Sequence, residues 1–85
     1  MRLTIFSKPG CHLCDEMKST VHSVLSTHAA ASSISIDEVD ISTDAALLER
    51  YALEIPVLLI DGRKVAKYRV SEAELRRMLD GRKGS

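Results

Sequence analysis

The N-terminal third of the chain begins with a short apolar run followed by an amphipathic stretch. Residues 3–6 are apolar or β-branched and lead into a Pro9-Gly10 pair, which predicts a strand that ends in a loop. The pattern then predicts an amphipathic helix that begins near Cys11 and ends within the Ser/Ala-rich tract 26–33. Its apolar positions recur at three- and four-residue intervals and are Leu13, Met17, Val21, Val24 and Leu25.

A second strand and a second helix are predicted in the middle of the chain. The strand covers residues 34–41, and its apolar phase shifts between Ile36 and Val39. Such a shift implies a bulge or a strand that is buried on both faces. The side-chain oxygens of residues 42–44 can cap the following helix, whose apolar positions extend to Leu53.

The C-terminal third predicts a hairpin and a third helix. Two strand-like runs, 57–60 and 63–68, flank an Asp61-Gly62 pair, which suits a turn that needs positive φ. Ser71 is followed three residues later by a glutamate, which fits a capping box, and an apolar stripe then continues until Gly81.

The predicted order is strand-helix-strand-helix-strand-strand-helix, an α/β arrangement. Helical crossovers make the first strands parallel, and the right-handed rule places helices on the faces of a small mixed sheet. We expect one domain over residues 1–80 and a flexible tail over 81–85. The loop that carries Cys11 then lies at the C-terminal end of the first strand, where open α/β sheets usually have their sites.

Composition and charge exclude several function classes. A chain of 85 residues can close one hydrophobic core and has no room for a second domain. Twelve Lys and Arg balance twelve Asp and Glu, so charge gives no general attraction to nucleic acid or to an anionic membrane. No apolar run approaches the ~20 residues that span a bilayer, and the start lacks a secretory signal. We expect a cytoplasmic monomer with no nucleic-acid or membrane partner; an organelle is the alternative compartment.

The two cysteines, Cys11 and Cys14, are separated by two residues. A disulfide that closes so short a loop removes little unfolded-state entropy, so structural stapling does not explain the pair. If the helix begins at Cys11, residues three apart are neighbours on its surface and can form a disulfide. Cys11 at the N-cap faces unpaired N–H groups and the positive end of the helix dipole, which favour a thiolate over a thiol. Cys11 is therefore the expected nucleophile. Cys14, one turn further in, suits the resolving role.

Two neighbours of the cysteines carry further chemistry. Lys8 lies on the same loop, and its ammonium could stabilise a thiolate or an anionic substrate, with a solvated loop lysine as the alternative. His12 could add positive charge or relay a proton, or only modulate the site. A structural zinc site needs four ligands, and only Cys11, Cys14 and at most His12 are local. We therefore expect no resident metal or cofactor, unless two chains share a dithiol site.

Residues 4–14, with Cys-His-Leu-Cys at their end, together with Ile55-Pro56-Val57 and Asp61-Gly62, resemble the glutaredoxins of the thioredoxin superfamily over nearly the whole chain. The resemblance implies a thioredoxin-like βαβαββα fold with a four-stranded mixed sheet and three helices. It also implies that Pro56 is a cis-proline that faces the cysteines. The cis bond would leave the Ile55 backbone free to pair with an extended substrate.

Two segments depart from the glutaredoxin pattern. Cys-His-Leu-Cys replaces the familiar Cys-Pro-Tyr-Cys, so the intervening proline and aromatic residue are lost. Residues 68–72, Tyr-Arg-Val-Ser-Glu, replace the Gly-Gly and acidic residue that typically bind glutathione. The sequence is most similar to small glutaredoxin-like proteins that keep the fold and the cysteines without the full glutathione motif.

The sequence thus predicts a thiol-disulfide oxidoreductase that serves electron transport and cell redox homeostasis. Its substrates would be protein or small-molecule disulfides, with glutathione as a possible co-substrate or a thioredoxin-type reductase as the electron source. The expected substrate-binding residues are Lys8, His12, Ile55 and Pro56. The alternatives are zinc or iron-sulfur binding through a dithiol shared between chains, and a redox-inactive interaction module.

Overall fold

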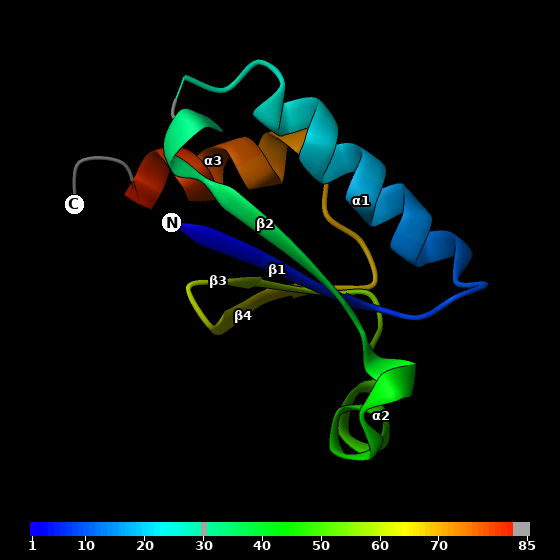
Figure 1. Cartoon of the computed structure of the whole chain (residues 1–85). Coiled ribbons are helices and arrows are strands. Elements are labelled where there is room, and N and C mark those ends of the chain that lie inside the picture. The colour runs from blue at the N-terminus through cyan, green and yellow to red at the C-terminus, as the bar shows by residue number, and fades with distance from the viewer. Residues whose placement is uncertain (30, 83–85) are drawn as a thin grey trace.

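A computed structural model describes residues 1–29 and 31–82 (Figure 1). Its four-stranded sheet has the order β2-β1-β3-β4. Strands β1 and β2 are parallel, whereas β1 pairs with β3 and β3 with β4 in antiparallel fashion, so the predicted mixed sheet is confirmed. The strands are β1 (Arg2–Ser7), β2 (Ser35–Asp40), β3 (Val57–Ile60) and β4 (Arg63–Lys67).

Three α-helices join and cover these strands, in the predicted thioredoxin-like βαβαββα order. Helices α1 and α3 lie together on one face of the sheet, and α2 lies apart from them near the C-terminal end of β2 (Figure 1). None of the described helices is long and apolar enough to cross a membrane. The helices are α1 (His12–Leu25), α2 (Ala45–Tyr51) and α3 (Glu72–Arg82), with short 3₁₀ turns η1 (Ala31–Ser33) and η2 (Ile41–Thr43).

The hydrophobic core lies between the sheet and the α1-α3 layer. Alternation along β1 turns Leu3 and Ile5 into this core, while Phe6 on the opposite face contacts Tyr51 of α2, with ring centroids 4.8 Å apart. Each fully buried aliphatic side chain contributes about 1.5–3 kcal/mol. The other core members are Met17, Val21, Val24, Leu58, Ile60, Val70, Leu75 and Leu79.

Local signals in the sequence set the helix starts and the hairpin. Asp44 caps α2 by accepting from the N–H groups of the next turn, and Ser71 and Glu74 form the predicted reciprocal capping box at α3. Asp61 and Gly62 both have positive φ, 50° and 83°, as a two-residue hairpin turn of the type I′ class requires. These predicted local features are confirmed.

The prediction for β2 was wrong. Its pairing with β1 is continuous, without a bulge, and no residue of this strand is fully buried because β2 lies at the edge of the sheet. The shift in apolar phase has another cause. Ile36 packs against the core, whereas Val39 is paired with Phe6, whose ring contacts Tyr51 on the α2 side. The two ends of β2 therefore face different helices.

The ends of α2 and α3 also differ from expectation. Helix α2 stops at Tyr51, and Leu53, expected on its apolar face, is 89% exposed. Helix α3 passes through Gly81, which keeps a helical backbone, and ends at Arg82. Residues 81 and 82 are thus helical and not part of a tail, and residues 83–85 of the predicted tail lie outside the described residues.

Candidate functional site

Cys11 is the N-cap of α1, as predicted. Its backbone is extended, with φ −88° and ψ 106°, and its sulfur accepts a hydrogen bond from the Cys14 N–H at 3.1 Å. The Cys11 carbonyl accepts from the Asp15 N–H at 3.2 Å, which begins the helical ladder. The sulfur thus occupies the place of a capping oxygen and satisfies one of the free N–H groups at the helix start.

Cys11 and Cys14 form a disulfide, with their Cα atoms 5.2 Å apart, within the usual range for such bonds. The two sulfurs differ in their access to solvent. Cys14 is fully buried beneath the first turn of α1, whereas Cys11 is half-buried. A molecule that approaches from solvent therefore meets Cys11 first, and Cys14 lies behind it.

Lys8 and His12 are both exposed beside the cysteines. The Lys8 carbonyl accepts from the Cys11 N–H at 3.3 Å, so the backbone of Lys8 shapes the loop. Among the described residues, the Lys8 ammonium makes no hydrogen bond or ion pair. It borders a hollow of about 160 Å³ together with Lys18, Asp15 and Asp40. The structure places Lys8 and His12 at the site but leaves their roles as predictions.

Asp40 gives this hollow a fixed negative charge. The Ser42 hydroxyl and the Ser42 N–H donate to its carboxylate, at 2.6 and 2.9 Å, and hold the pKa of Asp40 below its usual range. Lys18 adds a smaller effect in the same direction. The hollow thus combines two ammonium groups and two carboxylates, which gives it no strong preference for one sign of charge.

Ile55 and Pro56 lie at the same end of the sheet as the cysteine loop. The Ile55-Pro56 peptide bond is cis, as the resemblance implied. Pairing of Phe6 with Val57 places Pro56 beside the end of β1, where the loop toward Cys11 begins. Pro56 is buried, and its carbonyl accepts from the Tyr68 N–H at 2.8 Å.

The expectation that the Ile55 backbone is free was wrong for its N–H. That group donates to the Tyr51 carbonyl at 3.1 Å, because the chain turns back on itself after α2. Within the described part of the chain, the Ile55 carbonyl has no hydrogen-bond partner. A peptide that pairs with this segment can therefore use the carbonyl of Ile55 but not its N–H.

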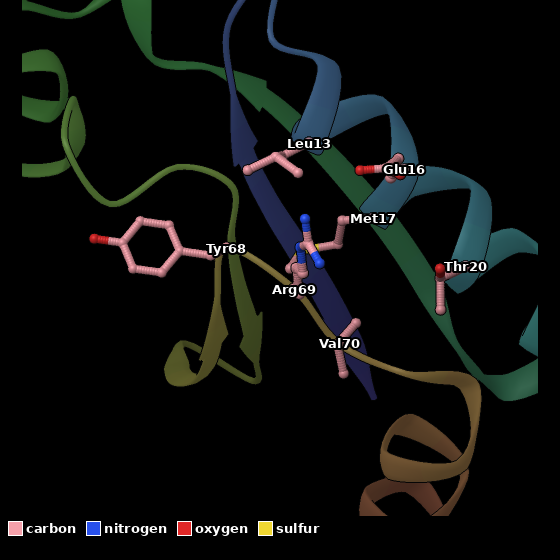
Figure 2. A pocket seen from close by; sticks show the side chains of 7 residues that line it. All are labelled: Leu13, Glu16, Met17, Thr20, Tyr68, Arg69 and Val70. Carbon is pink, nitrogen blue, oxygen red and sulfur yellow. The ribbon is translucent and has the colours of Figure 1, made fainter.

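The segment 68–70 closes the other side of the site. It faces α1 across a hollow of about 170 Å³ (Figure 2). Figure 2 shows the Arg69 guanidinium directed toward α1, near Leu13 and Met17, and the Tyr68 ring directed away from Arg69. The full lining is Leu13, Glu16, Met17, Thr20, Tyr68, Arg69 and Val70.

Sequence reasoning missed the role of Tyr68 as a link to the cis-proline segment. Its N–H donates to Pro56, and its hydroxyl donates to the Leu53 carbonyl at 2.9 Å. Its φ is +69°, in the left-handed region that favours glycine. The signal was present in the sequence, because Tyr68 opens the segment 68–72 that replaces the Gly-Gly motif of the glutaredoxin pattern.

The described residues, 1–29 and 31–82, offer no metal centre of their own. No group of three or more His, Cys, Asp or Glu side chains is close enough there to hold a metal ion. A metal at Cys11 and Cys14 would therefore need ligands from a second chain or from an external thiol.

Comparisons with known proteins agree with this fold. A family model described as Glutaredoxin-like domain (DUF836) matches residues 2–80. The Glutaredoxin-like protein YDR286C homolog of Dictyostelium discoideum is 25% identical over 77 residues, which are 88% of this chain and 71% of that protein.

Solved structures share the architecture. The X-ray structure of target protein XcR50 from X. campestris has a TM-score of 0.73 and 31% identity, covering 93% of this chain and 96% of its own. The germline-specific thioredoxin Deadhead from Drosophila melanogaster has a TM-score of 0.61 and 27% identity, covering 95% of this chain and 79% of its own. A thioredoxin-like fold with a Cys-x-x-Cys pair at the start of α1 points to redox function.

Proposed function

The chain belongs to the glutaredoxin-like domain family, and on that premise we propose that it is a thiol-disulfide oxidoreductase in which Cys11 is the nucleophile and Cys14 the resolving thiol. One observation carries the proposal. The Cys11 sulfur accepts the Cys14 N–H at the start of α1, while the Cys14 side chain is fully buried behind it. This arrangement stabilises negative charge on the accessible sulfur and keeps the second sulfur within reach.

The reductive reaction starts from the dithiol form. The Cys11 thiolate attacks one sulfur of a substrate disulfide, forms a mixed disulfide and releases one substrate thiolate, which takes a proton from water. Cys14, as a thiolate, then attacks the Cys11 sulfur. The Cys11–Cys14 disulfide forms and the second substrate thiol leaves. Two electrons have passed from the protein to the substrate, which leaves the chain in the disulfide form that the structure displays.

The return to the dithiol form needs two electrons from outside the chain. Two molecules of glutathione, or one dithiol of a thioredoxin-type reductase, can supply them by the same exchange in reverse. The two glutathione molecules join as one glutathione disulfide, whereas the reductase dithiol closes into an internal disulfide. Residues 68–72 lack the family's Gly-Gly glutathione motif, so the proposal does not require glutathione. Lys8, His12 and the Ile55 carbonyl are the groups proposed to contact the incoming substrate.

Titration with glutathione redox buffers, read by intact mass, tests the proposal. Wild type is expected to lose two hydrogen atoms as Cys11 and Cys14 join. Cys14→Ser is expected to accumulate a mixed disulfide with glutathione at Cys11, because the resolving attack is absent. Cys11→Ser serves as the matched control and is expected to reduce no disulfide. Full disulfide reduction by Cys11→Ser, or none by wild type with either reductant, would contradict the proposal.

A further inference from the structure

Two exposed apolar side chains adjoin the cis-proline segment. Leu53 is 89% exposed and Tyr68 is 42% exposed. The Tyr68 hydroxyl donates to the backbone carbonyl of Leu53 at 2.9 Å, so the two residues are neighbours. Leu53 precedes Pro56 by three residues, a span of at most about 11 Å, and Pro56 lies at the end of the sheet where the cysteine loop begins. Tyr68 also lines the hollow that Leu13, the residue before Cys14, borders on α1.

The backbone conformation of Tyr68 is costly for a residue of its type. Its φ of +69° is unfavourable for any residue with a Cβ atom, and a glycine adopts that conformation freely. The Tyr68 side chain points away from Arg69 (Figure 2) and remains partly exposed. Strained residues of this kind cluster at binding sites. The backbone N–H and the hydroxyl of Tyr68 also hold both ends of residues 53–56.

Positive charge surrounds the same pair. The Glu54 carboxylate accepts from the Lys64 ammonium at 2.9 Å, and the Lys67 ammonium lies 4.0 Å away. Arg50 adds a third cation near this single carboxylate. The Lys67 ammonium is also 5.5 Å from the centre of the Tyr68 ring. A chain with zero formal net charge thus has a local excess of positive charge next to its exposed apolar pair.

We propose, on the premise of the redox function above, that Leu53, Tyr68, Lys64 and Lys67 form a docking surface for polypeptide disulfides. The substrate segment has an apolar side chain and acidic side chains close to its reactive cysteine. The apolar side chain packs on Leu53 and the Tyr68 ring, and the carboxylates pair with the two lysines. A small uncharged disulfide such as bis(2-hydroxyethyl) disulfide offers neither group and gains nothing from this surface, which makes the surface a determinant of substrate choice.

The first test measures binding without chemistry. Two labelled peptides carry serine in place of the reactive cysteine; one has leucine and glutamates beside it, and the other has serine and lysines. Anisotropy with the oxidised protein at low salt should show the acidic-apolar peptide bound at least about fivefold more tightly. Leu53→Ser and Lys67→Gln should each remove most of this preference. Arg77→Gln, on α3 across the sheet, is the matched control and should retain it.

Equal affinity for the two peptides, or an equal loss in Arg77→Gln, would overturn the docking surface. Tyr68→Gly provides a second variant, because it removes the ring while relieving the left-handed backbone. If Tyr68→Gly remains folded and keeps the full preference, the ring has no part in binding. Light scattering checks a further possibility. A wild-type dimer that Leu53→Ser converts to a monomer would assign the surface to a second copy of the chain and overturn the proposal.

The second test measures turnover with the same two peptides, now with intact disulfides, and with bis(2-hydroxyethyl) disulfide. In Leu53→Ser, the ratio of kcat/KM for the acidic-apolar peptide to that for the small disulfide should fall at least about fivefold, mainly through KM. An unchanged ratio contradicts the docking surface. If wild type reduces none of the three, the redox function fails instead, and the docking surface stands or falls on the binding measurement.

Discussion

The Cys14 N–H lies 3.1 Å from the Cys11 sulfur and donates to it, so the sulfur of one cysteine caps the backbone N–H of the other. In the reduced protein this contact and the helix dipole favour the thiolate of Cys11. We expect the pKa of the Cys11 thiol to lie below that of an ordinary cysteine. In a single-cysteine comparison, Cys14→Ser should react with iodoacetamide faster than Cys11→Ser at neutral and mildly acidic pH. Equal rates across pH would contradict this prediction.

The same contact predicts an effect on stability. Serine can replace the Cys11 sulfur as an N-cap acceptor, whereas alanine cannot. Cys11→Ala should therefore unfold with a free energy about 1 kcal/mol lower than Cys11→Ser, a difference of about 4–8 °C in Tm for a domain of this size. Both variants lack the disulfide, so the comparison isolates the cap. Thermal unfolding of the two under reducing conditions checks it, and equal Tm values would count against the capping role.

A third prediction contrasts two leucines. Leu75 of α3 is fully buried in the core, whereas Leu53 is 89% exposed. Leu75→Ala should lower the free energy of unfolding by about 2–5 kcal/mol, because it removes buried methyl groups and leaves a cavity. Leu53→Ala should change it by less than about 0.5 kcal/mol. Urea unfolding of both variants measures the difference, and comparable losses would show that Leu53 is packed in solution.

Local patterns explain why most of the fold could be predicted. The capping box at Ser71, the Asp61-Gly62 turn and the N-cap at Cys11 each depend on residues within four positions of one another. Apolar periodicity then assigned the faces of α1 and α3. Prediction failed for β2, whose apolar phase depends on which helix covers each end of the strand. That information lies in the packing of distant segments.

In the candidate site, too, some features follow from nearby residues and others only from the packing of distant segments. The spacing of Cys11 and Cys14 predicted their contact, because three residues form nearly one helical turn. The hydrogen bond from the Ile55 N–H to the Tyr51 carbonyl depends on how the chain turns after α2. The hydrogen bond from the Tyr68 hydroxyl to the Leu53 carbonyl joins residues fifteen positions apart. Neither follows from periodicity or capping, so the access to the Ile55 backbone and the brace formed by Tyr68 required the structure.

The last prediction concerns the pH dependence of stability at Glu54. The hydrogen bond from Lys64 lowers the pKa of Glu54 in the folded chain, and the charges of Lys64, Lys67 and Arg50 act in the same direction against a partial offset from burial. In the unfolded chain Glu54 keeps the usual glutamate pKa of about 4.3. Between this pKa and the lowered pKa of the folded state, the unfolded chain therefore binds more protons than the folded chain. The stabilisation is therefore complete above the unfolded pKa and is lost as pH falls through the lowered one.

Glu54→Gln should accordingly have a lower Tm than wild type near neutral pH. The difference in Tm between wild type and Glu54→Gln should stay constant down to about pH 5. It should vanish in more acidic solution, where the wild-type Glu54 carboxyl becomes protonated. High salt should narrow the gap at neutral pH, because the ion pairs are partly exposed. Glu49→Gln on α2, whose carboxylate makes no ion pair with the described residues, controls for loss of one negative charge. Thermal melts followed by circular dichroism measure all three proteins, and a gap that persists or widens in acid would exclude a lowered pKa at Glu54.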